Sequence, residues 1–116
     1  MTGLVTFAGE PVTGGCVSGA ALDQMPPRDD LGSTRIGPDG RFRLPLGLTE
    51  GALAAANDNG GILNVDLFVS GIVDGRYRST PWGTSVDVTG AEPAEQVAID
   101  LDDAMDLGPA VGRCPD

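Results

Sequence analysis

The chain contains no histidine and no lysine, and its 7 basic residues are all arginines, against 17 acidic residues. Without histidine the chain lacks the commonest general base and the commonest metal ligand. The formal net charge of −10 and the scattered arginines exclude the clustered basic face that phosphate contacts need, so we expect no nucleic-acid binding. We therefore expect a protein that is not an enzyme, with no cofactor and no catalytic or metal-binding residues.

Aromatic residues make up only 4% of the 116 residues, so a buried core must be mainly aliphatic. No apolar run approaches the length of about 18 residues that a membrane-spanning helix needs, and we expect no membrane insertion. Residues 1–7 enter a strand pattern directly, without a basic region or a long apolar segment, so no signal peptide is expected. A chain of this length is long enough for one domain with a single core.

The clearest structural signal is the segment 36–46. Its Pro-Asp-Gly sequence is typical of a tight turn, in which glycine takes the position with positive φ. Phe42, Leu44 and Leu46 then alternate with polar or turn-forming residues, which is the period of a half-buried strand. A tight turn followed by such a strand predicts a β-hairpin.

Similar short patterns recur along the chain, with turn residues between them. We expect further strands at 4–8, 15–22, 62–69, 85–89 and 96–101, strand or loop at 77–82, and a short helix within 48–57. Thr49 is the expected N-cap of the helix, and Asn57 begins its stop signal. The pattern predicts an all-β fold, an antiparallel Greek-key β-sandwich of about seven strands over residues 1–101. Residues 102–116 are expected to form a tail with one helical turn at 102–107.

Two motifs carry a resemblance to a known family. The first is a G-x-P-V-x-G turn and the second a D-G-R-F-x-L strand entry, and their residues are Gly9, Pro11, Val12, Gly14, Asp39, Gly40, Arg41, Phe42 and Leu44. With these motifs the chain resembles the carboxypeptidase-regulatory-like, transthyretin-like domain family. The resemblance implies a transthyretin-like or immunoglobulin-like sandwich that has a structural rather than a catalytic role.

The composition, rich in alanine, glycine, aspartate and arginine and free of lysine, is similar to that of actinobacterial and actinobacteriophage proteins. With the short acidic tail, it resembles short minor tail proteins of such phages. The resemblance implies a virion component that has protein partners in a larger assembly, or copies of itself in a homo-oligomer. The alternative is a secreted or cell-surface module that binds a protein or a glycan.

Cys16 and Cys114 are the only cysteines, and two interpretations of them stay open. One is a disulfide that closes nearly the whole chain, which suits a virion or an extracellular setting. The other is a pair of reduced thiols, with Cys16 in the core and Cys114 on the tail.

Two further groups of residues stand out as candidates for a site. Arg76, Tyr77, Arg78 and Trp82 form the one aromatic and basic segment, and residues of these types dominate protein interfaces. The acidic segments 57–61 and 100–106 offer oxygen ligands but lack the spacing of a calcium loop, so we expect a helix stop and a solvated tail there.

Overall fold

β-Strands make up most of the computed structural model, which describes residues 1–21, 30–88 and 96–109. One helix, α1 (Glu50–Asp58), lies between the fifth and sixth strands in chain order. The strands are β1 (Thr2–Phe7), β2 (Glu10–Pro11), β3 (Gly15–Ala21), β4 (Asp30–Ile36), β5 (Arg41–Arg43), β6 (Ile62–Val73), β7 (Arg76–Asp87), β8 (Gln96–Asp100) and β9 (Met105–Pro109).

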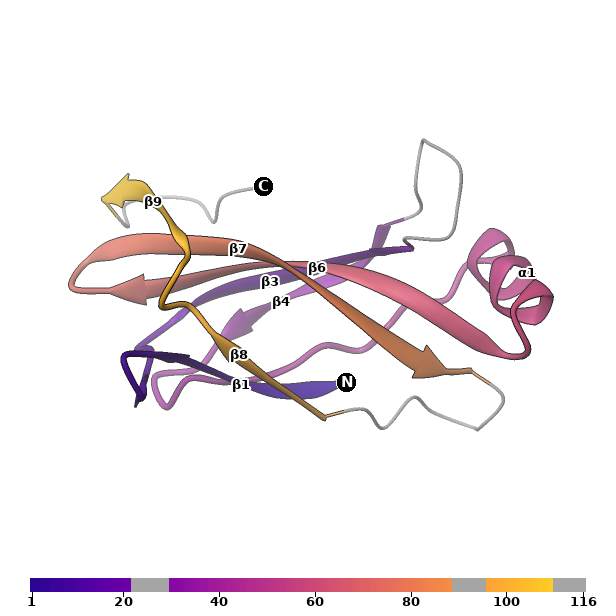
Figure 1. Cartoon of the computed structure of the whole chain (residues 1–116), viewed down its shortest axis with the longest axis horizontal. Coiled ribbons are helices and arrows are strands. Elements are labelled where there is room, and N and C mark those ends of the chain that lie inside the picture. The colour runs from indigo at the N-terminus through magenta and orange to yellow at the C-terminus, as the bar shows by residue number, and fades with distance from the viewer. Residues whose placement is uncertain (22–29, 89–95, 110–116) are drawn as a thin grey trace.

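The strands form two sheets that pack face to face (Figure 1). The five-stranded sheet has the order β4-β3-β6-β7-β9, and all of its pairs are antiparallel. In the four-stranded sheet, β1 is central, with β8 along one side and both β5 and β2 along the other. The expected all-β sandwich with one short helix is confirmed. The pair β1–β8 is parallel and is the exception to the expected antiparallel pattern.

The hairpin of β6 and β7 is the longest unit of the fold and runs along the whole sandwich (Figure 1). Asp74 and Gly75 form its two-residue turn, both with positive φ, as a hairpin turn that matches the twist of the strands requires. β7 runs through the segment 77–82, which includes Pro81, into the segment 85–89, which the sequence pattern treated as separate, and it ends at Asp87.

Pro81 is tolerated because of its position in the ladder. The N–H of Val88 donates to the carbonyl oxygen of Gly61, 2.9 Å away, and the register pairs Phe68 with Pro81. In an antiparallel ladder, the backbone N–H and C=O groups of successive residues point alternately toward and away from the paired strand. Because Val88 bonds to the β6 side, the even-numbered residues of β7 bond to β6, and the backbone groups of the odd-numbered residues point away from it. The missing N–H of Pro81 is therefore on the far side of β7 and removes no bond to β6.

The two motifs that carry the family resemblance lie side by side on one edge of β1. The N–H of Val5 donates to the carbonyl oxygen of Gly40 (2.8 Å), and the carbonyl oxygen of Val5 accepts from Val12 (3.0 Å). Gly40 has a φ of +79°, as the turn chemistry predicts. The Asp39 carboxylate accepts the N–H of Arg41 at 3.1 Å, which closes the turn.

The core lies between the two sheets and is almost entirely aliphatic. Leu46, which alternates with Phe42 and Leu44 in the segment 36–46, is only partly buried. The buried core residues include Phe42, Leu44, Leu63, Val65, Leu67 and Val86. Phe42 is the one large aromatic side chain in this group, and its ring covers Gly3, the residue opposite it on β1. Any side chain at position 3 would collide with that ring, so the close approach requires glycine.

Helix α1 closes one end of the sandwich and begins as the sequence indicates. The Thr49 hydroxyl accepts the N–H of Ala52 at 3.0 Å, and Ala52 and Ala56 are the residues of α1 buried in the core. The chain leaves the helix through two glycines with positive φ, and the N–H of Gly61 donates to the Ala56 carbonyl oxygen at 2.8 Å. The acidic segment 57–61 therefore acts as a helix stop.

The expected helical turn at 102–107 is wrong, because this segment contains a turn followed by β9. The Asp102 carboxylate accepts the N–H of Ala8 at 2.6 Å, and the Asp100 carboxylate accepts that of Asp102 at 2.9 Å. β9 then pairs with the first residues of β7. The bond to Ala8 and the pairing with β7 join this segment to residues far away in the sequence, in place of the hydrogen bonds that a helical turn would form within it.

Replacing Leu44 with alanine should lower the free energy of unfolding by about 2–5 kcal/mol, because its side chain is fully buried between the sheets. Leu53 is the matched control, since it is exposed on α1, and Leu53→Ala should change that free energy by less than about 0.5 kcal/mol. Chemical denaturation measures both. Equal effects of the two substitutions would show that Leu44 is not part of the core.

Replacing Gly40 with valine should be more destabilising than replacing Gly60 with valine. Both glycines have positive φ, which a residue with a Cβ adopts at a cost of about 1–2 kcal/mol, so both variants should be destabilised by that amount. Only at Gly40 would a Cβ meet a neighbour, at 2.7 Å from the Val5 oxygen, which adds about 1–3 kcal/mol of overpacking. Thermal or chemical denaturation that ranks the two variants equally would contradict the tight junction between β1 and the turn.

Candidate functional site

The predicted interface residues Arg76, Tyr77, Arg78 and Trp82 all lie on β7, but alternation along the strand places Tyr77 on the opposite face from the other three. Arg78 and Trp82 pair with Gly71 and Leu67 and share the inner face of the sheet with them. Tyr77 lies on the opposite face and is buried. The strand therefore does not present the four side chains as one exposed patch.

Three of these four side chains have partners within the fold. The Arg78 guanidinium lies over the ring of Phe7, 5.2 Å from its centroid, which is a cation–π distance. Trp82 is half-buried and packs against the core. Arg76 forms an exposed ion pair with Asp106, 2.9 Å from Nε to Oδ2. Hydrogen bonding to Arg76 lowers the pKa of Asp106, and the N–H of Gly108 lowers it further.

The backbone of β7 offers a binding surface that its side chains do not. β9 pairs with β7 only as far as Ser79, and among the described residues no strand follows it along the rest of that edge. The N–H and C=O groups of Gly83 and Ser85 point to that side, by the same alternation that places Pro81 there. Both residues are exposed. The sequence signal for this edge was Pro81, since proline within a strand marks an edge.

At the other end of the five-stranded sheet, the edge of β4 has a bonded neighbour at its beginning. The N–H of Gly47 donates to the Leu31 carbonyl oxygen at 2.8 Å, so the segment after β5 meets that edge at Leu31. Edge strands are sites of unwanted pairing unless a protein covers or interrupts them. The distal half of β7 is thus an edge that the described chain leaves uncovered by a strand.

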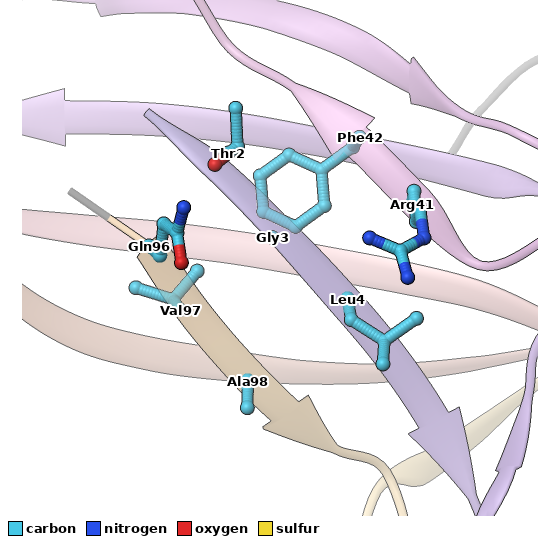
Figure 2. Close-up of a pocket in the computed structure, with 8 residues that line it drawn as sticks. All are labelled: Thr2, Gly3, Leu4, Arg41, Phe42, Gln96, Val97 and Ala98. Carbon is cyan, nitrogen blue, oxygen red and sulfur yellow. The ribbon is translucent and has the colours of Figure 1, made fainter. Parts of the chain in front are cut away.

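A second candidate is a shallow groove of about 600 Å³ along the four-stranded sheet. Figure 2 shows β1 along its floor, with Arg41 on the β5 side and Gln96 on the β8 side. The Arg41 side chain is 74% exposed, and its Nε lies 3.9 Å from the Asp39 carboxylate. A guanidinium and an amide across an open groove can donate hydrogen bonds to carboxylate or hydroxyl groups.

Three of the four acidic residues of the segment 100–106 accept hydrogen bonds within the fold. The Asp100 and Asp102 carboxylates each accept a backbone N–H, and the Asp106 carboxylate accepts from Arg76. Within residues 1–21, 30–88 and 96–109, no three histidine, cysteine or acidic side chains are grouped so that they could hold a metal ion.

Comparisons with protein families, with curated proteins and with solved structures gave no match. The resemblance to transthyretin-like domains therefore stays a hypothesis that rests on the two motifs. In the described part of the chain, no helix has the length and apolarity to cross a membrane.

Cys16 lies on β3, between Arg35 of β4 and Ser70 of β6. Its neighbour Val17 is fully buried on the inner face, so Cys16 is on the outer face of the five-stranded sheet. Ser70 pairs with Cys16 on one side and with Ser79 on the other, and the hydroxyls of the two serines are 2.7 Å apart. The predicted partner of Cys16 is Cys114, which lies outside the described residues, so the disulfide stays a prediction.

The position of Cys16 is compatible with that disulfide. Pro109 at the end of β9 is three strand spacings from β3, a lateral distance of about 14 Å. Cys114 is five positions after Pro109, and five extended residue steps can span up to about 17 Å. The Cα atoms of a disulfide are themselves about 5.5 Å apart, which leaves enough chain for the bridge.

Mass spectrometry of the unreduced, natively assembled protein tests the disulfide. We expect a mass two hydrogens lower than that of the reduced protein, with no alkylation of either cysteine. A Cys16→Ser variant is the control, because it should lose this difference and expose Cys114 to alkylation. Alkylation of both thiols in the unreduced wild-type protein would show that the cysteines are reduced.

Proposed function

We propose that the chain is a non-catalytic structural module that joins a larger protein assembly by accepting a partner strand along the distal edge of β7. The observation that carries this proposal is the backbone of Gly83 and Ser85, along which no strand of the described residues pairs. Strand addition to an exposed edge is a common mode of protein recognition, in which backbone hydrogen bonds supply the affinity. The assembly that the resemblance favours is the tail of a virion.

The length of the β6–β7 ladder beyond the end of β9 supports the proposal. β9 ends at the middle of β7, opposite Ser79. The ladder between β6 and β7 continues unchanged past this point to Asp87. The distal half of β7 is therefore already held in the extended conformation that a partner strand requires, which lowers the entropy lost on binding.

The charge of the chain favours a different protein as the partner over a second copy. Self-association would bring together two molecules with a formal charge of −10 each. In a symmetric pair, the exposed acidic residue Asp87 of both copies would also lie close to the shared edge. Strand addition between two copies of this chain is thus less favoured than strand addition by a different protein.

The alternative function is a secreted or cell-surface module that binds a protein or glycan. The groove in Figure 2 favours this alternative, because Arg41 and Gln96 can donate hydrogen bonds to sugar hydroxyls or carboxylates. Its binding would require the side chain of Arg41 and not the edge of β7. Arg41→Gln and a block of the β7 edge therefore separate the two functions.

A Gly83→Pro variant should abolish incorporation into the assembly, because it removes an N–H that points away from β6 and leaves the internal ladder intact. Gly83→Ala is the matched control: it keeps the N–H, and the position has room for a methyl group. Both variants and the wild type are expressed in the native source, and the fraction that co-sediments with large particles is measured.

Wild type and Gly83→Ala should co-sediment, while Gly83→Pro should remain in the soluble fraction as a folded monomer with a cooperative melting curve. Equal co-sedimentation of folded Gly83→Pro would contradict strand addition at this edge. Sedimentation of the wild type only as a monomer would contradict the assembly function itself. Loss of binding in Arg41→Gln alone would favour the groove instead.

A further inference from the structure

A pocket of about 290 Å³ lies at the end of the sandwich opposite helix α1. Two hairpin turns form its mouth: the β1–β2 turn at Ala8 and the β6–β7 turn at Asp74. In Figure 1 the β6–β7 turn lies at the far left, and α1 is at the far right. The pocket is thus remote from the distal edge of β7 and independent of it.

The walls of the pocket are mostly apolar. Phe7 and Val73 are partly buried and pack against the core, and Val12 is almost completely buried. Ile72 lines the pocket between them. A pocket with such walls can take up an aliphatic chain with favourable removal of apolar surface from water.

Hydrogen bonds hold these walls in place before any ligand binds. The N–H of Ile72 donates to the Gly14 carbonyl oxygen at 2.9 Å, which joins β6 to the segment after β2. The N–H of Ala8 donates to the Asp102 carboxylate, which fixes the other turn from outside. The pocket is therefore preformed, and binding of a ligand would lose little conformational entropy in the protein.

The mouth of the pocket is acidic. Glu10 and Asp74 both line it, one from each hairpin, and Asp102 is adjacent through its bond to Ala8. Two described cations are adjacent to the lining, and both have partners: Arg78 lies over the ring of Phe7, and Arg76, opposite Val73, forms its ion pair with Asp106. Two carboxylates around an apolar cavity, in a chain with a net charge of −10, attract a positive group and disfavour a negative one.

We propose that this end pocket binds a long cationic side chain, arginine or lysine, from a partner protein. The aliphatic stem would contact Phe7 and Val12, and the charged head would lie between Glu10 and Asp74 at the mouth. Long basic side chains have this division into an apolar stem and a charged head. The volume of about 290 Å³ suits one side chain rather than a larger ligand.

The test uses the full chain labelled with nitrogen-15 and two blocked tripeptides. Acetyl-Gly-Arg-Gly-amide is the probe, and the same peptide with citrulline, a neutral isostere of arginine, is the control. The arginine peptide should shift the amide signals of Val12, Thr13 and Ile72 with a Kd of about 1–10 mM, and added salt should weaken it. The citrulline peptide should bind at least about fivefold more weakly.

A Glu10→Gln/Asp74→Asn double variant should raise the Kd for the arginine peptide by about fivefold or more. Asparagine is well tolerated at positive φ, so the turn at position 74 is kept. The matched control is Glu50→Gln/Asp58→Asn on α1, which removes the same charge far from the pocket and should leave the Kd within about twofold.

Three results would overturn the proposal: no shifts at the pocket up to about 20 mM peptide, equal binding of the citrulline peptide, or an unchanged Kd in the double variant at position 10 and position 74. The Gly83→Pro variant, if folded, should bind the arginine peptide as the wild type does. Failure of the pocket proposal and failure of strand addition at β7 are therefore distinguishable.

Discussion

The register of the β6–β7 hairpin determines most of this structure. Its ladder runs without interruption from Ile62 opposite Asp87 to Val73 opposite Arg76. One face of the ladder supplies core residues such as Leu63 and Val65, and the other carries the buried pair of Ser70 and Ser79. A shift of one residue would exchange these faces and place the serines in the core. β3 and β9 pair with the two sides of this hairpin, so their positions depend on the same register.

Close packing of larger side chains against glycine compensates for the scarcity of aromatic side chains. Gly3 lies beneath the ring of Phe42, and a Cβ at Gly71 would be 2.6 Å from the Leu101 side chain. At both positions glycine lets a larger neighbour fill space that a second side chain would otherwise need. The chain has 18 glycines, and the glycines at these two positions are part of the packing of the core as well as of its turns.

Local patterns in the sequence were sufficient for the elements whose bonds are local. The alternation at Phe42 and Leu44, the turn at Gly40 and the cap at Thr49 are all confirmed, because neighbouring residues determine each of them. The elements that sequence analysis did not predict depend on distant partners. β9 exists through its pairing with β7, and the parallel pairing of β8 with β1 joins the two ends of the chain. No periodicity within a short window can encode such contacts.

The same distinction explains what the sequence could reveal about binding. The types of the residues in the segment Arg76–Trp82 indicated an interface, but alternation along β7 directs Arg78 and Trp82 inward, where Phe7 and the core engage them. At the free side of β7 it is the backbone N–H and C=O of Gly83 that point away from β6. Their direction follows from how the strands pair and not from the type of residue. The acidic pocket likewise arises only when two hairpin turns, far apart in the sequence, meet at one end of the sandwich. One hairpin thus carries the two unlike surfaces that we propose for recognition, a neutral backbone edge near α1 and a charged mouth at its turn. A partner that engaged both would have to present an extended strand and a basic side chain at opposite ends of the molecule, and this geometry is far more selective than either contact alone.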